Sequence, residues 1–146
     1  MENLEAKQTK ALEDASAFIK SHVVSSFKPV AYYDERLDCV RVITRDCSVT
    51  EFRINEYLTI AEDTHSANLS DRYVGFTVKG IRHFMRALNK EPKSLELTVL
   101  LDQVLAELPA YMPDVSARKL VEFAVNIALW ILDKSKIKKV EVKLAA

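Results

Sequence analysis

The pattern of apolar and polar positions divides the chain into a helical beginning, an alternating middle and a helical end. One stripe along residues 4–24 carries the apolar side chains: Leu4, Ala11, Leu12, Ala15, Phe18 and Ile19. Lysine and glutamate fill much of the remaining surface, so the stripe is narrow and rich in alanine. This spacing predicts an amphipathic helix that ends at Ser25, Ser26 and Pro29.

Residues 30–61 change to a period of two, which is typical of strands. Two β-rich runs flank Arg45 and Asp46, which predicts a hairpin with a two-residue turn. In that register three pairs of residues lie opposite each other: Asp38 and Arg53, Val42 and Val49, Cys39 and Phe52. Cys39 and Cys47 then lie far apart along the ladder, so we expect no disulfide between them.

The next strand follows a polar stretch at residues 62–71, which predicts a loop. Residues 72–79 alternate, with Val74, Phe76 and Val78 on one face, and Gly80 ends the strand. Glycine weakens a strand unless close approach requires it. Gly75 therefore predicts that a helix or a neighbouring strand packs closely against it.

The period is helical again after Gly80 and predicts three helices. The first covers Ile81 to Leu88, the second covers Leu97 to Leu108, and Ser116 is expected to cap the last. Residues 95–99 also alternate, so the start of the second helix fits a strand as well. Six residues of the last helix are expected to face inward: Leu120, Phe123, Ala124, Ile127, Ala128 and Ile131. Alternation at Val140, Val142 and Leu144 predicts a terminal strand.

Together these elements predict a single α+β domain that spans residues 1–146. Its antiparallel sheet has about four strands, within residues 30–79, and is covered by an N-terminal helix and three C-terminal helices. Strands follow one another without crossover helices, which excludes a doubly wound parallel sheet.

Composition narrows the classes of function. The 146 residues are 49% hydrophobic and 29% charged, as in soluble globular proteins. Lysine plus arginine equals aspartate plus glutamate, and the zero net charge disfavours a nucleic-acid-coating protein and favours self-association. Two cysteines, the polar N-terminus and the lack of a long apolar stretch predict a cytoplasmic protein without a membrane span.

One segment of the middle region resembles a known family. Tyr33-Asp34-Glu-Arg-Leu-Asp38 precedes a strand, and Tyr73-Val-Gly-Phe-Thr-Val78 places a glycine before an apolar, alternating run. Residues 30–80 are similar in this respect to the bacterial domain of unknown function family 2283. The flanking helices and the polar loop depart from that family. The resemblance implies a fold and no chemistry.

Four polar residues are the first candidates for a ligand patch: Tyr33, Asp34, Asp38 and His65. Paired carboxylates support acid–base or metal chemistry when their environments differ. A turn aspartate and a pairing of Asp38 with Arg53 explain the same residues without function. A metal site needs three or four ligands, and the sequence does not bring that many together. We therefore expect no metal and no cofactor.

The last helix is apolar on more than one face, because five further apolar residues lie off its main stripe: Val121, Val125, Leu129, Trp130 and Leu132. Such a helix must be covered on both sides, by the sheet and by a further helix or another subunit. The sequence thus predicts a non-catalytic interaction or assembly module that forms a homodimer through Val125, Leu129 and Trp130.

Two alternatives stay open. One is a small-ligand-binding protein or enzyme with a pocket between sheet and helices. The other is a nucleic-acid accessory protein that uses the basic run at residues 134–139, which would show salt-dependent binding.

Overall fold

The computed structural model describes residues 3–22, 27–66, 68–88, 94–109 and 114–142. Its centre is a five-stranded antiparallel sheet with the strand order β1-β2-β5-β4-β3. The strands are β1 (Val30–Asp34), β2 (Cys39–Ile43), β3 (Val49–Arg53), β4 (Leu58–Asp63) and β5 (Tyr73–Lys79). The predicted α+β class and the antiparallel sheet are confirmed, with five strands in place of about four.

The predicted hairpin, in which β2 pairs with β3, is wrong. β5 lies between these strands: β2 pairs with β5, so that Val42 is opposite Phe76, and β3 pairs only with β4, so that Phe52 is opposite Ile60. The three predicted pairs, Asp38–Arg53, Val42–Val49 and Cys39–Phe52, do not form. Burial explains the order. β5 has the most buried residues of the five strands and takes the centre, whereas every residue of β3 is exposed and suits an edge.

The segment that packs closely against Gly75, as the sequence predicts, is strand β2. A Cβ atom at this position would overlap the backbone oxygen of Val42. Its neighbours Val74, Phe76 and Val78 are buried, as predicted. Glycine therefore lets the two central strands lie together at this point.

The helices are α1 (Leu4–His22), α2 (Ile81–Leu88), α3 (Leu97–Ala106) and α4 (Val115–Ser135), with a short 3₁₀ helix η1 (Leu69–Asp71). Strand β6 (Ser94–Glu96) precedes α3 and pairs antiparallel with β7 (Lys139–Glu141). Residues 95–99 thus contain both a strand and a helix start. The predicted terminal strand is confirmed at Val140, while Leu144 lies outside the described residues.

Two boundaries differ from the prediction. Asp114, and not Ser116, caps α4, because its carboxylate accepts hydrogen bonds from the N–H groups of Ser116 and Ala117 at 2.9 and 3.3 Å. The stretch predicted as a loop at residues 62–71 contains the end of β4 and the 3₁₀ helix η1.

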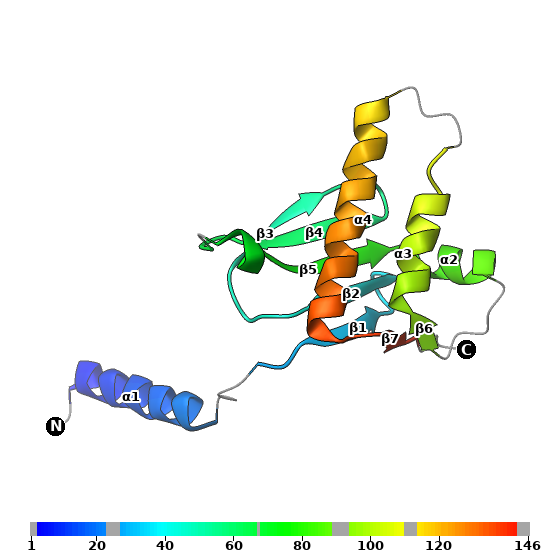
Figure 1. The fold of residues 1–146 in the computed structure, drawn as a ribbon. Coiled ribbons are helices and arrows are strands. Elements are labelled where there is room, and N and C mark those ends of the chain that lie inside the picture. The colour runs from blue at the N-terminus through cyan, green and yellow to red at the C-terminus, as the bar shows by residue number, and fades with distance from the viewer. Residues whose placement is uncertain (1–2, 23–26, 67, 89–93, 110–113, 143–146) are drawn as a thin grey trace.

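The core lies between the sheet and the helices α3 and α4 (Figure 1). Six residues of α4 are buried: Val121, Ala124, Val125, Ala128, Ile131 and Leu132. They face strands β4 and β5 on one side and α3 on the other. The further helix that an apolar α4 requires is therefore α3 of the same chain.

Helix α1 forms as predicted but does not cover the sheet. Residues 3–21 are all exposed, and α1 stands apart from the sheet in Figure 1. Helix α4, which is longer and carries more branched apolar residues, covers the face over β4 and β5 instead. The apolar stripe of α1 is left facing outward.

Candidate functional site

Tyr33 and Asp38 meet at the turn between β1 and β2. The Tyr33 hydroxyl donates to Asp38 Oδ1 at 2.7 Å. The same carboxylate oxygen accepts from the backbone N–H of Arg82 at 3.1 Å, in the first turn of α2. Asp38 adopts a left-handed φ of 50°, and its backbone oxygen accepts from the N–H groups of Gly80 and Ile81 at 3.0 and 3.3 Å. Asp38 therefore caps α2 from a distant turn, which is a structural role.

Burial of the Tyr33 hydroxyl raises its pKa to about 12, with a further contribution from the hydrogen bond to Asp38. A phenol with a raised pKa keeps its proton at neutral pH and therefore remains a hydrogen-bond donor. The pair is thus suited to hold the turn and the start of α2 together.

The remaining members of the predicted ligand patch, Asp34 and His65, lie apart from each other. Asp34 Oδ1 accepts from the N–H of Leu37 at 3.2 Å and stabilises the turn itself. His65 follows β4, and its N–H donates to Asp63 Oδ1 at 3.0 Å. The strand register places Asp34 near the end of β5 and His65 near its beginning. The structure therefore brings together Tyr33, Asp34 and Asp38 but not His65.

A second polar cluster connects loop residues to the end of α4, and no pattern in the sequence indicates it. The Arg45 guanidinium donates to the Asp63 carboxylate and, at 2.8 Å, to the backbone oxygen of Asp71. Lys134 lies 3.4 Å from Asp71 Oδ1 and 4.9 Å from the centre of the Trp130 ring. The hydrogen bond from His65, and after it Arg45, lowers the pKa of Asp63. The predicted hairpin turn at Arg45 is therefore wrong, and its side chain instead binds the end of β4 and η1.

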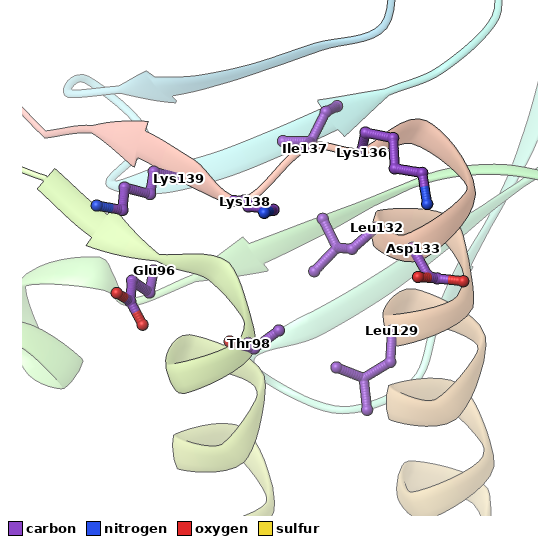
Figure 2. Close-up of a pocket in the computed structure, with 9 residues that line it drawn as sticks. All are labelled: Glu96, Thr98, Leu129, Leu132, Asp133, Lys136, Ile137, Lys138 and Lys139. Carbon is purple, nitrogen blue, oxygen red and sulfur yellow. The ribbon is translucent and has the colours of Figure 1, made fainter.

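Charged residues surround a cavity of about 510 Å³ between the start of α3, the end of α4 and the pair β6–β7 (Figure 2). Leu129, Leu132 and Ile137 supply apolar lining. The charged lining residues carry both signs: Lys136, Lys138, Lys139, Glu96 and Asp133. All five are exposed, so the cavity is an open, amphipathic depression. None of the four predicted ligand residues lines it.

The solvent side of α4 carries an apolar stripe, of which the sequence analysis places Leu120, Phe123 and Ile127 inward. Leu120, Phe123, Ile127 and Trp130 recur every three or four residues and share one helical face. Phe123 is 65% exposed, and Leu120 and Trp130 are also exposed. We call these four residues the α4 stripe. Leu120 and Phe123 are therefore corrections to the predicted inward set.

A groove of about 210 Å³ runs between this stripe and the edge of the sheet. Its apolar lining comes from α4, from β3 and the residue after it, from β4 and from the start of β5, and includes Phe52, Ile54, Tyr73, Leu120, Phe123 and Ile127. Glu62 of β4 is the charged residue of the lining. We call it the apolar groove. Tyr73 also lines a neighbouring cavity of about 220 Å³ below Trp130, so the two hollows adjoin along α4. Strand β3 forms the outer rim and, as an edge strand, leaves one side of its backbone unpaired.

The three residues predicted to form an interface lie in different environments. Val125 is fully buried between the sheet and α3, so it is part of the protein's own core and not of an exposed surface. Leu129 is half-buried and lines the cavity of Figure 2. Trp130 is exposed and belongs to the α4 stripe.

The two cysteines are free, Cys39 buried and Cys47 half-buried. Within the described residues, no three side chains of histidine, cysteine, aspartate or glutamate converge as a metal site would require. No helix in the described ranges has the length and apolar character to cross a membrane.

Comparison of the chain with protein-family models, with curated proteins and with solved structures gave no match. The resemblance of residues 30–80 to family 2283 therefore remains a prediction.

Proposed function

We propose that the protein is a non-catalytic assembly module that binds a second copy of itself through the α4 stripe and the apolar groove. The observation that carries this proposal is the exposure of Leu120, Phe123 and Trp130 beside Phe52 on an uncovered edge strand. Scattered apolar residues are normal on a protein surface, but a continuous patch marks an interaction site.

The energetics favour covering this surface. Fully burying one large apolar side chain stabilises by about 1.5–3 kcal/mol, and aromatic residues dominate the energy of protein interfaces. Phe123, Phe52 and Trp130 offer three aromatic side chains that the single chain leaves 65%, 45% and 41% exposed. The formal net charge of zero adds little repulsion between copies.

The polar residues that first suggested chemistry have structural partners. Asp38 caps α2 and holds the Tyr33 hydroxyl, and Asp34 stabilises its own turn. His83 Nε2 lies 2.9 Å from Glu107 Oε1, which joins α2 to the end of α3. These contacts support a scaffold more than a reaction centre. Free thiols at Cys39 and Cys47 fit the reducing cytoplasm, where we place the protein.

Light scattering at micromolar concentration tests the proposal. We expect the full chain to have twice its single-chain mass of 16.6 kDa. Phe123→Glu places a charge in the apolar groove and should produce the monomer, whereas Ala106→Glu adds the same charge at an exposed position of α3 that does not line the groove and should not. A wild-type chain that stays monomeric at micromolar concentration would contradict the proposal.

The lysine-rimmed cavity of Figure 2 supports a second candidate, the binding of a phosphate-bearing ligand such as a nucleic acid. A fluorescent 20-mer oligonucleotide should then bind with an affinity that falls steeply as salt rises. The combined change of Lys136, Lys138 and Lys139 to alanine should remove that binding. Binding that is insensitive to salt or to these substitutions would exclude this candidate.

A further inference from the structure

Helix α1 presents an amphipathic surface that its own chain leaves open. Leu4, Leu12 and Ile19 are exposed, with Leu12 at 72%. Helices in proteins gain most of their stability from packing an apolar face, and residues 3–21, which include nearly all of α1, are exposed. The sequence pattern of α1 is therefore that of a helix made to pack against another surface.

The body of the protein offers one surface of matching kind. The α4 stripe spans eleven residues from Leu120 to Trp130, a length of about 15 Å at the rise of an α-helix. The α1 stripe spans sixteen residues from Leu4 to Ile19, or about 22 Å. One α1 helix is thus long enough to cover the whole α4 stripe.

The side-chain sizes of the two surfaces are complementary. The centre of the α1 stripe consists of alanines, Ala11 and Ala15, whereas the α4 stripe consists of large residues such as Phe123 and Trp130. Small residues allow a helix backbone to come close, and large side chains on the facing helix fill the space that remains. A helix with large residues along its centre would stand further from the groove.

We infer that α1 of one copy docks in the apolar groove of a second copy, and that the exchange is reciprocal. This inference rests on the proposed function and names the segment that the groove binds. A second copy is favoured because the single chain leaves both surfaces exposed, with α1 apart from the groove in Figure 1. A two-fold exchange covers both α1 helices and both grooves with the same contact, as closed dimers do.

The adjacent cavity supports the same arrangement. Pro29, at the point where the chain leaves the N-terminal segment, lines the hollow below Trp130. The N-terminal segment therefore enters the body beside the end of the α4 stripe. An exchanged α1 would start from this end of one groove and reach the groove of the partner across the two-fold axis.

The test uses full-length variants and light scattering. Leu12→Glu places a charge on the α1 stripe, and Ala17→Glu adds the same charge on the opposite side of α1 as its control. We expect Leu12→Glu to raise the dimer dissociation constant about 100-fold, about tenfold for each of the two identical contacts, and Ala17→Glu to leave it unchanged. Neither position contributes to the core, so thermal unfolding in a dilute sample, where wild type is also dissociated, should stay the same.

Mixing the two variants, Leu12→Glu and Phe123→Glu, distinguishes this arrangement from other ways of forming a dimer. In an equimolar mixture one contact joins the intact α1 of Phe123→Glu to the intact groove of Leu12→Glu, and both substitutions fall in the other contact. Because dimers of either variant alone have no intact contact, mixed dimers should be more abundant than dimers of either variant. If Phe123→Glu is monomeric while Leu12→Glu remains a dimer, the groove binds something other than α1: the inference fails and the proposed function stands. If Leu12→Glu is monomeric while Phe123→Glu remains a dimer, α1 binds elsewhere and both fail. A wild-type monomer whose α1 packs in its own groove would overturn both.

Discussion

A side chain at Gly75 would overlap the backbone oxygen of Val42 on the neighbouring strand. The obstacle is backbone, which cannot move aside as a flexible side chain can. We expect Gly75→Ala to lower the free energy of unfolding by about 1–3 kcal/mol, although alanine is otherwise better than glycine in a strand. Denaturant unfolding measures this change. Thr77→Ala, on the same face two residues later, should cost less than 1 kcal/mol.

An unchanged or raised midpoint for Gly75→Ala would mean that β2 and β5 can separate locally at no cost. The pairing of Ile43 with Gly75 would then be looser than the structure shows.

Asp38 supplies two properties at once: one substitution removes both, and another keeps both but removes the charge. Its side chain caps α2, and its backbone has a left-handed φ of 50° that aspartate and asparagine tolerate better than most residues. Asp38→Ala loses both and should destabilise by about 1–3 kcal/mol. Asp38→Asn keeps the conformation and an oxygen acceptor and should lose about half as much or less. Thermal unfolding at pH 7 checks the order; equal losses would show that the charge alone matters.

The raised pKa of Tyr33 gives a defined pH dependence. The folded pKa is about 12, compared with the unfolded value of 10.0. Below pH 10 both states hold the proton, so Tyr33 contributes its full stabilisation. As pH rises from 10 towards 12, the unfolded state loses the proton first, and stability falls.

The measurement compares wild type with Tyr33→Phe, since lysines and other tyrosines titrate in the same range. The difference in unfolding free energy between the two proteins should be constant from pH 7 to 9 and shrink between pH 10 and 12. A constant difference across the whole range would exclude a coupling between Tyr33 ionisation and folding.

The two thiols should differ in reactivity. Cys39 is buried and Cys47 is half-buried, and both are free. Alkylation of the native protein should therefore modify Cys47 first, and alkylation after unfolding without a reductant should modify both. Intact mass after each step gives the count. No modification after unfolding would reveal a disulfide between the two cysteines, and a single modification would show that one thiol is blocked in another way.

The helices and strands of this fold could be predicted more reliably than which strands lie next to one another. The period of the sequence identified the strands and the helices α2, α3 and α4, because burial of one face repeats locally along the chain. The order of the strands depends on contacts between distant residues. Arg45 and Asp46 looked like a tight turn, but Arg45 instead binds Asp63, eighteen residues away. Such a partner leaves no local signal.

The candidate site was less accessible to sequence reasoning for the same reason. Tyr33 and Asp38 were correctly placed near each other because five residues and one turn separate them. Their actual partner, the start of α2, lies more than forty residues away. On α4, apolar residues surround the helix, so the sequence did not show which of Val125 and Phe123 faces the core. The spacing of Leu120, Phe123, Ile127 and Trp130 was visible, but its exposure was not.

Two substitutions on α4 separate core from surface. Val125 is completely buried between the sheet and α3, and Leu120, five residues earlier, is 49% exposed on the α4 stripe. Val125→Ala leaves a cavity and should lower the free energy of unfolding by about 2 kcal/mol. Leu120→Ala removes less buried surface and should cost less than 1 kcal/mol in a dilute sample, while it weakens self-association at higher concentration.

Unfolding at two protein concentrations distinguishes these effects: the midpoint of wild type and of Val125→Ala should rise with concentration, and that of Leu120→Ala should rise less. If Val125→Ala instead removed the concentration dependence and left the dilute midpoint unchanged, Val125 would belong to an interface and the packing of α4 against α3 would be wrong.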